Sequence, residues 1–399
     1  AQQIHYANRV RPNSCQMKVG GPQAACASVV TIMTTLFFRF MRCGDFISVK
    51  PHASPVFHAI QFLLGQLDAS QLRQLRALGG IQAYPSRTKD PDNVDFSTGS
   101  VGLGAVAPNF AALTDRYLRT HQLGTAVGHR RFISLVGDAE LDEGSVWEAV
   151  AERIMGGLEE VLWIVDLNRQ SLDRVIPGVR ARSWREMFAA NGWNILDVKY
   201  GRLLQEAFEQ PNGDLLRTCV DEMSNEAYQS LLRLSPSDLR DWLPKKSRYP
   251  RELRRLLDRW DNIQLHDVFW NLGGHDISEM EAALDKSARN SGPTVIFAYT
   301  LKGWKLPIVG HPQNHSVVLN DEQMESVRSD LEIPVGQEWS GFPTDSPEGE
   351  LCAEVSRRLY PPRSAPVASP PLPIPNELPT AYQGTRSTQQ TFGAVLSSL

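Results

Sequence analysis

The segment from Arg131 to Leu167 restricts the possible folds more than any other part of the chain. Residues 131–136 and 161–167 are apolar runs of strand length, and residues 145–155 between them have the apolar spacing of a helix. Two strands joined by one helix predict a right-handed βαβ unit, in which the strands are parallel. We therefore predict an α/β fold with a parallel sheet flanked by helices on both faces.

Further strands and helices are predicted on either side of this unit. Residues 193–198 and 294–299 have the composition of additional strands, and residues 1–78 read as helical. Between the additional strands, residues 203–259 form a charge-rich helical insertion that is strongly basic from residue 245 onward. We interpret the basic run as the solvated face of a helix, with a docking patch for an acidic partner as the alternative.

The sequence divides into three parts. Residues 1–360 contain all the predicted strands and form the α/β domain, and residues 361–380 are rich in proline, as in a linker. Residues 381–399 begin another helix, whose apolar residues lie on one stripe. Because one short amphipathic helix cannot bury its own stripe, we predict that residues 381–399 start a second domain. That domain would continue in a longer chain or in a partner subunit.

The composition argues against several classes of function. A formal net charge of -4 gives no electrostatic footprint for nucleic acid. The nearest candidate for a membrane span is residues 24–40, but serine, threonine and arginine interrupt it, so we expect a buried helix. The five cysteines are widely spaced and no pair has the spacing of metal ligands, which predicts reduced thiols in a cytoplasmic protein.

Two polar residues stand where the strands of the βαβ unit end. Asp138 follows the first strand, and Asn168 ends the second, thirty positions later. The carboxyl ends of parallel strands share one edge of the sheet, where open α/β sheets bind ligands. Mg²⁺ takes about six oxygen ligands. Asp138, Asn168 and the backbone carbonyl of Gln170 could supply three of them, and a diphosphate could supply others. Gly137 would let the backbone approach the phosphate closely.

The same region allows a simpler interpretation and contains a second anion-binding feature. Aspartate is a favourable helix cap, so Asp138 could instead only cap the following helix. Residues 97–104 place a glycine-rich turn at the start of a helix, where several backbone N–H groups are left for an anion. The pairing of Asp138 with Asn168 favours the metal site over the cap.

These segments resemble a known cofactor motif. Gly137-Asp138-Ala139, with Asn168 thirty positions after Asp138, is similar to the thiamin diphosphate (thiamine pyrophosphate) motif Gly-Asp-Gly followed by asparagine. From about residue 8 to its end, the chain resembles the amino-terminal domain of the homodimeric pyruvate-dehydrogenase-type decarboxylase. This family is the first component of 2-oxo-acid dehydrogenase complexes and belongs to the transketolase superfamily. Further segments support the resemblance by their order and spacing: residues 19–21, 51–55, 84–85, 101–104, 273–276, 300–303 and 314–315.

The resemblance implies roles for individual residues. Three groups would bind Mg²⁺, namely the side chains of Asp138 and Asn168 and the Gln170 carbonyl. Other residues would lie against the cofactor: Ser100, Val101, Leu103, Gly137, Ala139 and Glu140. His52 would stand near the reacting centre, and Lys302 and His315 would lie in or beside a mobile loop that closes over it. His311 could replace His315 in this role, and Lys302 could instead be a solvated cation at a strand end.

The chain departs from the family pattern at four positions. Pro22 stands where the family usually has histidine, and Ala25 stands where it usually has serine. Ser86 follows Tyr-Pro where some members have histidine, and Ala139 replaces the second glycine of the motif. The change at Ala139 is mild if the position needs negative φ and costly if it needs positive φ. We expect these departures to affect the choice of substrate more than the cofactor.

The resemblance implies thiamin-diphosphate- and Mg²⁺-dependent oxidative decarboxylation of a 2-oxo acid, pyruvate or a close analogue, with acyl transfer to a lipoyl carrier. This chain would supply the diphosphate-binding half, and a second, pyrimidine-binding domain or subunit would complete the site. A homodimer or heterotetramer and a lipoyl-bearing acyltransferase are the expected partners. The alternatives are a transketolase-like transfer of ketol units and a non-catalytic cofactor-binding or assembly subunit.

Overall fold

The computed structural model describes residues 1–12, 19, 21–123, 128–171, 174–175, 180–362 and 384–398. The chain divides into two compact units, Ala1–Pro361 and Pro362–Leu399. Among the described residues, the first contains every strand and nearly all of the helices, and the second contains helix α18 (Thr388–Ser398). Most of the proline-rich segment that we interpret as a linker lies outside the described residues.

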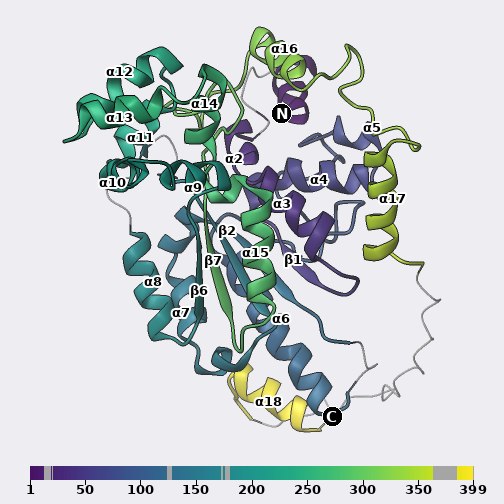
Figure 1. Cartoon of the computed structure of the whole chain (residues 1–399). Helices are drawn as coiled ribbons and strands as arrows, with labels where there is room; N and C mark the ends of the chain where they lie inside the picture. The colour runs from purple at the N-terminus through teal and green to yellow at the C-terminus, as the bar shows by residue number, and fades with distance from the viewer. Residues whose placement is uncertain are drawn as a thin grey trace. The chain divides into compact units, whose positions relative to one another are not determined.

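A five-stranded parallel sheet forms the centre of the first unit (Figure 1). Its strands in spatial order are β1 (Phe46–Ser48), β2 (Phe132–Gly137), β3 (Val161–Leu167), β7 (Thr294–Tyr299) and β6 (Asn194–Val198). All four neighbouring pairs are parallel, so the predicted α/β fold is confirmed. Strands β3 and β7 have the predicted bounds, and the predicted bounds of β2 and β6 are displaced by one residue at most.

Strand β1 shows that the helical interpretation of residues 1–78 was wrong at residues 46–48. It lies at the edge of the sheet, with Phe46 opposite Phe132 of β2. Three residues are too few to show an alternating pattern, and their strand conformation depends on pairing with β2. The short antiparallel pair β4 (Gln170–Ser171) and β5 (Arg174–Val175) was not predicted either.

Helices cover both faces of the sheet, as predicted. Successive side chains of a strand point to opposite faces. Val165 and Phe297 therefore belong to one apolar cluster, whereas Ile164 and Ile296 belong to another. The first cluster includes residues of α6 (Leu103–Thr120), α7 (Gly144–Ala151) and α8 (Ala181–Ala190). The second includes residues of α3 (Val30–Thr35), α4 (Ser54–Leu63) and α15 (Ile277–Ser287).

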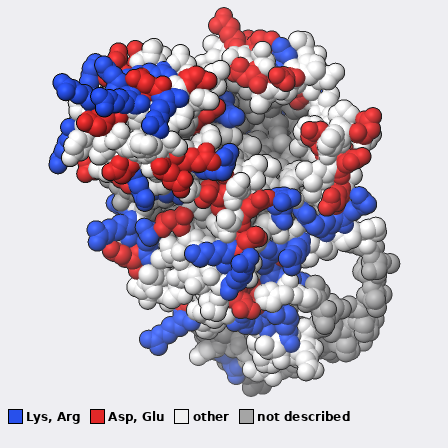
Figure 2. All heavy atoms as spheres, viewed as in Figure 1, with Lys and Arg blue, Asp and Glu red and all other residues white. Residues whose placement is uncertain are grey.

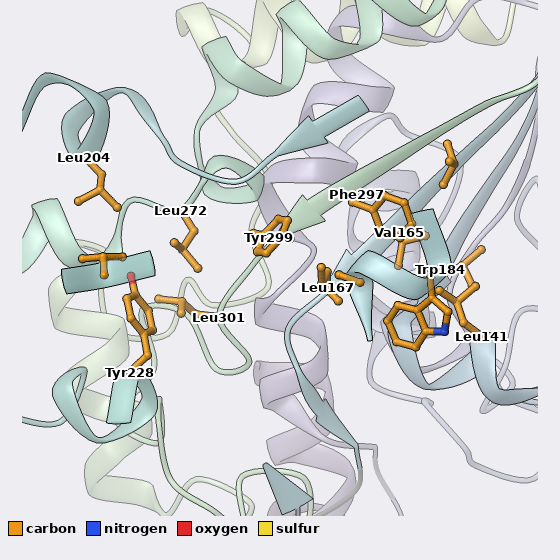
Figure 3. Packing of buried hydrophobic residues seen from close by; sticks show 14 of the residues in the cluster. Leu141, Val165, Leu167, Trp184, Leu204, Tyr228, Leu272, Phe297, Tyr299 and Leu301 are labelled. Carbon is orange, nitrogen blue, oxygen red and sulfur yellow. The ribbon is translucent and has the colours of Figure 1, made fainter. Parts of the chain in front are cut away.

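The helical insertion shares the first of these clusters. Leu204 and Tyr228 of the insertion belong to the same cluster as Tyr299 at the end of β7, with Leu272 between them (Figure 3). The helices of this region are α9 (Arg202–Phe208), α10 (Gly213–Glu222), α11 (Asn225–Leu231), α12 (Pro236–Lys246), α13 (Pro250–Leu257) and α14 (Asn262–Trp270). The insertion is thus joined to the sheet by a continuous core near the carboxyl ends of the strands.

The basic run lies on α12 and α13. Helix α13 buries Leu253, Leu256 and Leu257, while its arginines lie on the other side, where Arg254 pairs with Asp241 of α12 at 3.1 Å. Lysine and arginine side chains gather over these helices together with acidic ones (Figure 2). An apolar inner side and a mixed-charge outer side are typical of a solvated helix.

The apolar residues 24–40 form several buried helical turns. These are α2 (Gln23–Ala27), α3 and a π-helical turn at Leu36–Phe40. The remaining helices are α1 (Gln2–His5), α5 (Ala69–Leu72), α16 (Asp321–Asp330) and α17 (Pro347–Leu359). None of the helices in the described part of the chain is long and apolar enough to cross a membrane. The four described cysteines are free, and Cys15 lies outside the described residues.

Candidate functional site

The carboxyl ends of four neighbouring strands bring polar side chains to one edge of the sheet. Lys50 comes after β1, Asp138 after β2, Asn168 after β3 and Thr300 after β7. All four residues are buried, with exposed fractions of 7%, 3%, 2% and 1% in that order. The structure therefore brings Asp138 and Asn168 to the same edge and adds two residues to them.

Asp138 is held against the turn that follows β3. Its Oδ2 accepts a hydrogen bond of 2.7 Å from the N–H of Arg169. Arg169 has φ of 59°, in the left-handed region that residues other than glycine rarely adopt. Burial raises the pKa of Asp138 to about 6, although the charge of Lys50 opposes this shift. A buried carboxylate of this kind is stabilised by a cation placed next to it.

The groups around Asp138 suit a hard divalent cation. The Nδ2 of Asn168 donates to Asp166 Oδ2 at 3.2 Å, which turns the amide oxygen of Asn168 away from Asp166. Gln170 opens β4 two residues later. Among the described residues no cluster of three or more His, Cys, Asp or Glu could hold a metal. A metal here would therefore take one carboxylate, one amide oxygen and one backbone carbonyl, which are ligands that Mg²⁺ accepts alongside phosphate oxygens and water.

A buried ion pair lies beside this turn. Lys50 Nζ is 2.5 Å from Asp166 Oδ2, and Asp166 also accepts hydrogen bonds from Ser28, Thr300 and Asn168. Burial alone would raise the pKa of Asp166 and lower that of Lys50. Their mutual attraction and the hydrogen bonds outweigh burial, so the pKa of Asp166 lies below its ordinary value and that of Lys50 above it. Both groups are therefore charged at neutral pH.

Glu140 closes the turn that contains Gly137, and Gly102 lies in a second turn of the site. The Oε2 of Glu140 accepts a hydrogen bond of 3.0 Å from the N–H of Gly137. Gly102 begins α6 with φ of 79°, and a Cβ there would lie 2.8 Å from Val146 Cγ2. A Cβ on Gly137 would lie 3.1 Å from Lys50 Cε. Gly137 therefore makes room for Lys50, an additional reason for glycine besides the predicted approach of a phosphate.

The predicted cofactor contacts at the start of α6 lie on either side of Gly102. Ser100 is half-buried, whereas Val101 and Leu103 are 52% and 54% exposed. A Cβ on Gly104 would lie 2.9 Å from Ser48 Oγ, so this turn lies next to the end of β1. The two apolar side chains therefore lie on the surface next to the polar edge of the sheet.

Three residues predicted to be catalytic lie close together. Lys302 Nζ is 3.3 Å from His315 Nδ1, and the ring centroids of His52 and His315 are 5.7 Å apart. Tyr84 contacts the His52 ring edge-on, also at 5.7 Å. Burial, followed by the charges of Lys50 and His315, lowers the pKa of His52 to about 4. The imidazole of His52 is therefore neutral at pH 7.

Two other histidines have structural contacts. His311 Nδ1 accepts the backbone N–H two residues further along its own loop, whereas His315 is the histidine beside Lys302. His275 accepts the N–H of the residue before Lys302 at 2.7 Å, and its ring stacks on Trp304 at 4.5 Å. His275 therefore helps to hold the segment that carries Lys302.

The departures from the family pattern have different structural consequences. Ala139 lies in a 3₁₀ turn, Asp138–Asp142, and is not among the described residues with positive φ, so alanine fits there without strain. Pro22 and Ala25 are buried at α2, where neither side chain can donate or accept a hydrogen bond. The N–H of Ser86 donates to Asp90.

Comparison with known proteins agrees with this geometry. Residues 38–210 match the family model described as "Transketolase, thiamine diphosphate binding domain". Over this segment the chain is similar to that domain. The matched segment contains β1, β2, β3 and β6 and includes Lys50, Asp138 and Asn168.

Curated proteins that resemble the chain include pyruvate dehydrogenase E1 components. The protein of Cupriavidus necator is 26% identical over 365 residues, which cover 86% of this chain and 40% of the relative. That of Escherichia coli K12 is 27% identical over 342 residues, covering 82% of this chain and 38% of the relative. The chain thus spans about two fifths of the length of the relatives it matches.

Solved transketolases share the fold of this chain. A Pichia stipitis transketolase aligns with a TM-score of 0.60 and 14% identity, over 89% of this chain and 42% of the other. The Campylobacter jejuni enzyme aligns with a TM-score of 0.58 and 17% identity, over 89% and 45%.

The sequence analysis did not identify four residues of the site: Lys50, Asp166, Ser28 and Thr300. One signal was available. Asp166 is a charged residue inside the apolar run 161–167, and a charge inside a buried strand requires a partner. No sequence signal named Lys50 as that partner, because 116 positions separate the two residues.

Proposed function

We propose that the chain is the diphosphate-binding half of a thiamin-diphosphate- and Mg²⁺-dependent enzyme that decarboxylates a 2-oxo acid, pyruvate or a close analogue. In the complete protein the acyl group would pass to a lipoyl carrier. One observation carries the proposal: the Asp138 carboxylate accepts the Arg169 N–H and so lies at the turn between Asn168 and Gln170. The names of the curated relatives support the substrate class.

In this proposal Asp138, Asn168 and the carbonyl of Gln170 bind Mg²⁺, and the metal binds the diphosphate. Backbone groups of Ala139 and Glu140 contact the diphosphate. The residues at the start of α6 would contact the next part of the cofactor, where the apolar side chains of Val101 and Leu103 would lose contact with water on binding.

When bound, thiamin diphosphate supplies the carbanion chemistry that a 2-oxo acid needs to lose CO₂. The chain's own residues would position the substrate and handle protons. His52 is neutral at pH 7, because burial and then neighbouring positive charges lower its pKa to about 4, so its imidazole offers one donor and one acceptor nitrogen to the substrate. Lys302 and His315 lie together next to His52, and the ammonium group of Lys302 would attract the carboxylate of a 2-oxo acid.

The proposed enzyme needs a second, pyrimidine-binding domain or subunit. The chain spans about two fifths of its curated relatives, and residues 381–399 would begin that domain. A homodimer or a heterotetramer, a lipoyl-bearing acyltransferase as partner and a cytoplasmic location belong to the same proposal.

Calorimetric titration with thiamin diphosphate tests the proposal directly. We expect heat of binding in the presence of Mg²⁺ and none when EDTA removes the metal. Thiamin without the diphosphate should bind much more weakly, because the proposed contacts hold the diphosphate. Absence of any metal-dependent heat would refute the cofactor assignment.

Activity measurements on the complete protein then separate the two enzymatic possibilities. Reduction of a dye acceptor with pyruvate or 2-oxobutyrate, followed by acylation of a lipoyl domain, is the expected result. Transfer of ketol units between sugar phosphates, without turnover of any 2-oxo acid, would instead favour the transketolase-like alternative. The likeness to solved transketolases does not decide between them, because it concerns the fold.

A further inference from the structure

Lys50 is a buried ammonium group with few acceptors around it. Its side chain is 9% exposed, and an ammonium group carries three N–H donors. Within the described residues, Lys50 Nζ has a single hydrogen-bond acceptor, Asp166 Oδ2 at 2.5 Å. Buried polar groups nearly always have partners, so the remaining donors of Lys50 imply a ligand at this place.

The position of Lys50 shows which ligand could reach it. A Cβ placed on Gly137 would lie 3.6 Å from Lys50 Nζ, so the ammonium group lies at the start of the turn that contains Asp138. The same turn ends β2 and is the proposed place of the metal and of the diphosphate. An anion bound there would lie next to a fixed positive charge.

Asp166 fixes Lys50 and does not itself act as a metal ligand. Its Oδ2 accepts from Lys50, Ser28 and Asn168, and its Oδ1 accepts from Thr300. Both carboxylate oxygens are thus occupied by protein donors. Because these contacts hold Asp166, they also hold the ammonium group in one place, and a fixed charge loses little freedom when a ligand binds.

We propose that Lys50 is a diphosphate-binding residue: its ammonium group, fixed by Asp166, donates its remaining N–H groups to the cofactor's diphosphate beside the Mg²⁺. This proposal rests on the proposed function above. It places a second positive group, the Lys50 ammonium, next to the diphosphate in addition to the metal ion. The alternative is a purely structural ion pair, which ties the end of β1 to β3 across the intervening strand β2 and contacts no ligand.

Calorimetry with Lys50→Gln distinguishes these two roles. If Lys50 binds the diphosphate, the variant should lose affinity for the anion but not for the metal. Removing the positive charge should weaken thiamin diphosphate binding at saturating Mg²⁺ by about tenfold or more. Binding of Mn²⁺ alone, used as a probe for the metal site, should stay unchanged or become tighter because the site becomes more negative. The matched control is Lys286→Gln, an exposed position on α15, which should change neither titration.

The double variant Lys50→Gln/Asp166→Asn keeps the test valid if the single variant is unstable. It removes both charges, so the local net charge and the polar contacts are largely preserved. We expect Mn²⁺ affinity close to that of the unaltered chain and thiamin diphosphate affinity still about tenfold lower. Thiamin diphosphate affinity restored to that of the unaltered chain would overturn the proposal, as would equal losses for the metal and the cofactor in both variants.

The unaltered chain separates this proposal from the proposed function. If it shows no metal-dependent binding of thiamin diphosphate, the proposed function itself fails. If it binds and the Lys50 variants bind equally well, only the role of Lys50 is refuted.

Discussion

The Lys50–Asp166 ion pair allows a quantitative prediction about stability. Both side chains are buried, with exposed fractions of 9% and 0%. Breaking a buried pair by removing one partner usually costs about 3–5 kcal/mol, because the other charge remains buried without compensation. For Lys50→Gln we expect the lower end, about 3 kcal/mol, because glutamine can still donate one hydrogen bond to Asp166.

The cost has an upper limit that follows from proton binding. A buried Asp166 without Lys50 can take up a proton and become neutral. Protonating a carboxyl group of ordinary pKa at pH 7 costs about 4 kcal/mol, since each pKa unit corresponds to about 1.4 kcal/mol. The free energy of unfolding of Lys50→Gln should therefore fall by no more than about 4 kcal/mol from this source.

The pH dependence has a definite sign. In the unaltered chain the pKa of Asp166 is lowered by folding, so its contribution to stability is present above the ordinary value of 3.8 and is lost as pH falls through the lower folded value. The pKa of Lys50 is raised, so its contribution is present below 10.5 and is lost as pH rises through the higher folded value. In Lys50→Gln, burial should instead raise the pKa of Asp166. The destabilisation should then shrink as pH falls from 7 toward about 4.

Urea denaturation followed by circular dichroism at several pH values measures these effects. Asp166→Asn and the double variant complete a double-mutant cycle, from which we expect a coupling energy of about 2–3 kcal/mol. The matched control is Arg202→Gln, which removes an exposed pair with Glu206 and should change stability by at most about 0.5 kcal/mol. A loss below about 1 kcal/mol for Lys50→Gln, or a loss that grows on acidification, would refute the reasoning.

Three further predictions concern single residues of the site. Asp138→Asn should lower Mg²⁺-dependent thiamin diphosphate affinity by about 100-fold in calorimetry. Asp142→Asn changes an exposed position in the same turn, and this variant should bind normally. Similar affinities for both variants would contradict the metal assignment. Gly102→Ala should lower the free energy of unfolding by about 1–3 kcal/mol, because φ is 79° and the new Cβ meets Val146. In the same urea experiment Gly144→Ala should leave the free energy of unfolding nearly unchanged, because the space around Gly144 is open. His52 should titrate near pH 4 in NMR spectra, because burial and neighbouring positive charges disfavour its protonated form, and a midpoint near 6.5 would contradict the burial seen here.

The sheet could be predicted from sequence because its central strands are buried on both faces. Such strands are continuous apolar runs, and β3 and β7 were predicted with their observed bounds. Strand β1 could not be predicted, because three residues carry no periodic pattern and their conformation depends on pairing with β2. The helices of the insertion continue to Trp270, beyond the predicted end at residue 259, because α14 has few charges to mark it as part of the same region.

The site could be predicted only where a short motif marks it. Asp138 and Asn168 follow recognisable strands, so their meeting at one sheet edge was foreseeable. The grouping of His52 with His315 depended on the family resemblance, since 263 positions separate them. Lys50 was not found because an isolated lysine before a proline has no distinctive pattern, and its partner lies inside a strand that was read only for its apolar residues.

The order of the strands explains why these groups form one site and how the site depends on folding. Lys50, Asp138, Asp166 and Thr300 belong to β1, β2, β3 and β7 or follow them directly, and these strands are adjacent in the sheet although they are far apart in sequence. A shift of one strand by a single residue would turn its side chains to the opposite face. The ion pair from Lys50 to Asp166 spans β2, and the bond from Thr300 to Asp166 joins β7 to β3. The contacts that would hold the proposed anion site thus also fix the relative register of β1, β3 and β7. A variant that loosens β1 should therefore weaken diphosphate binding even when it leaves Asp138 and Asn168 untouched.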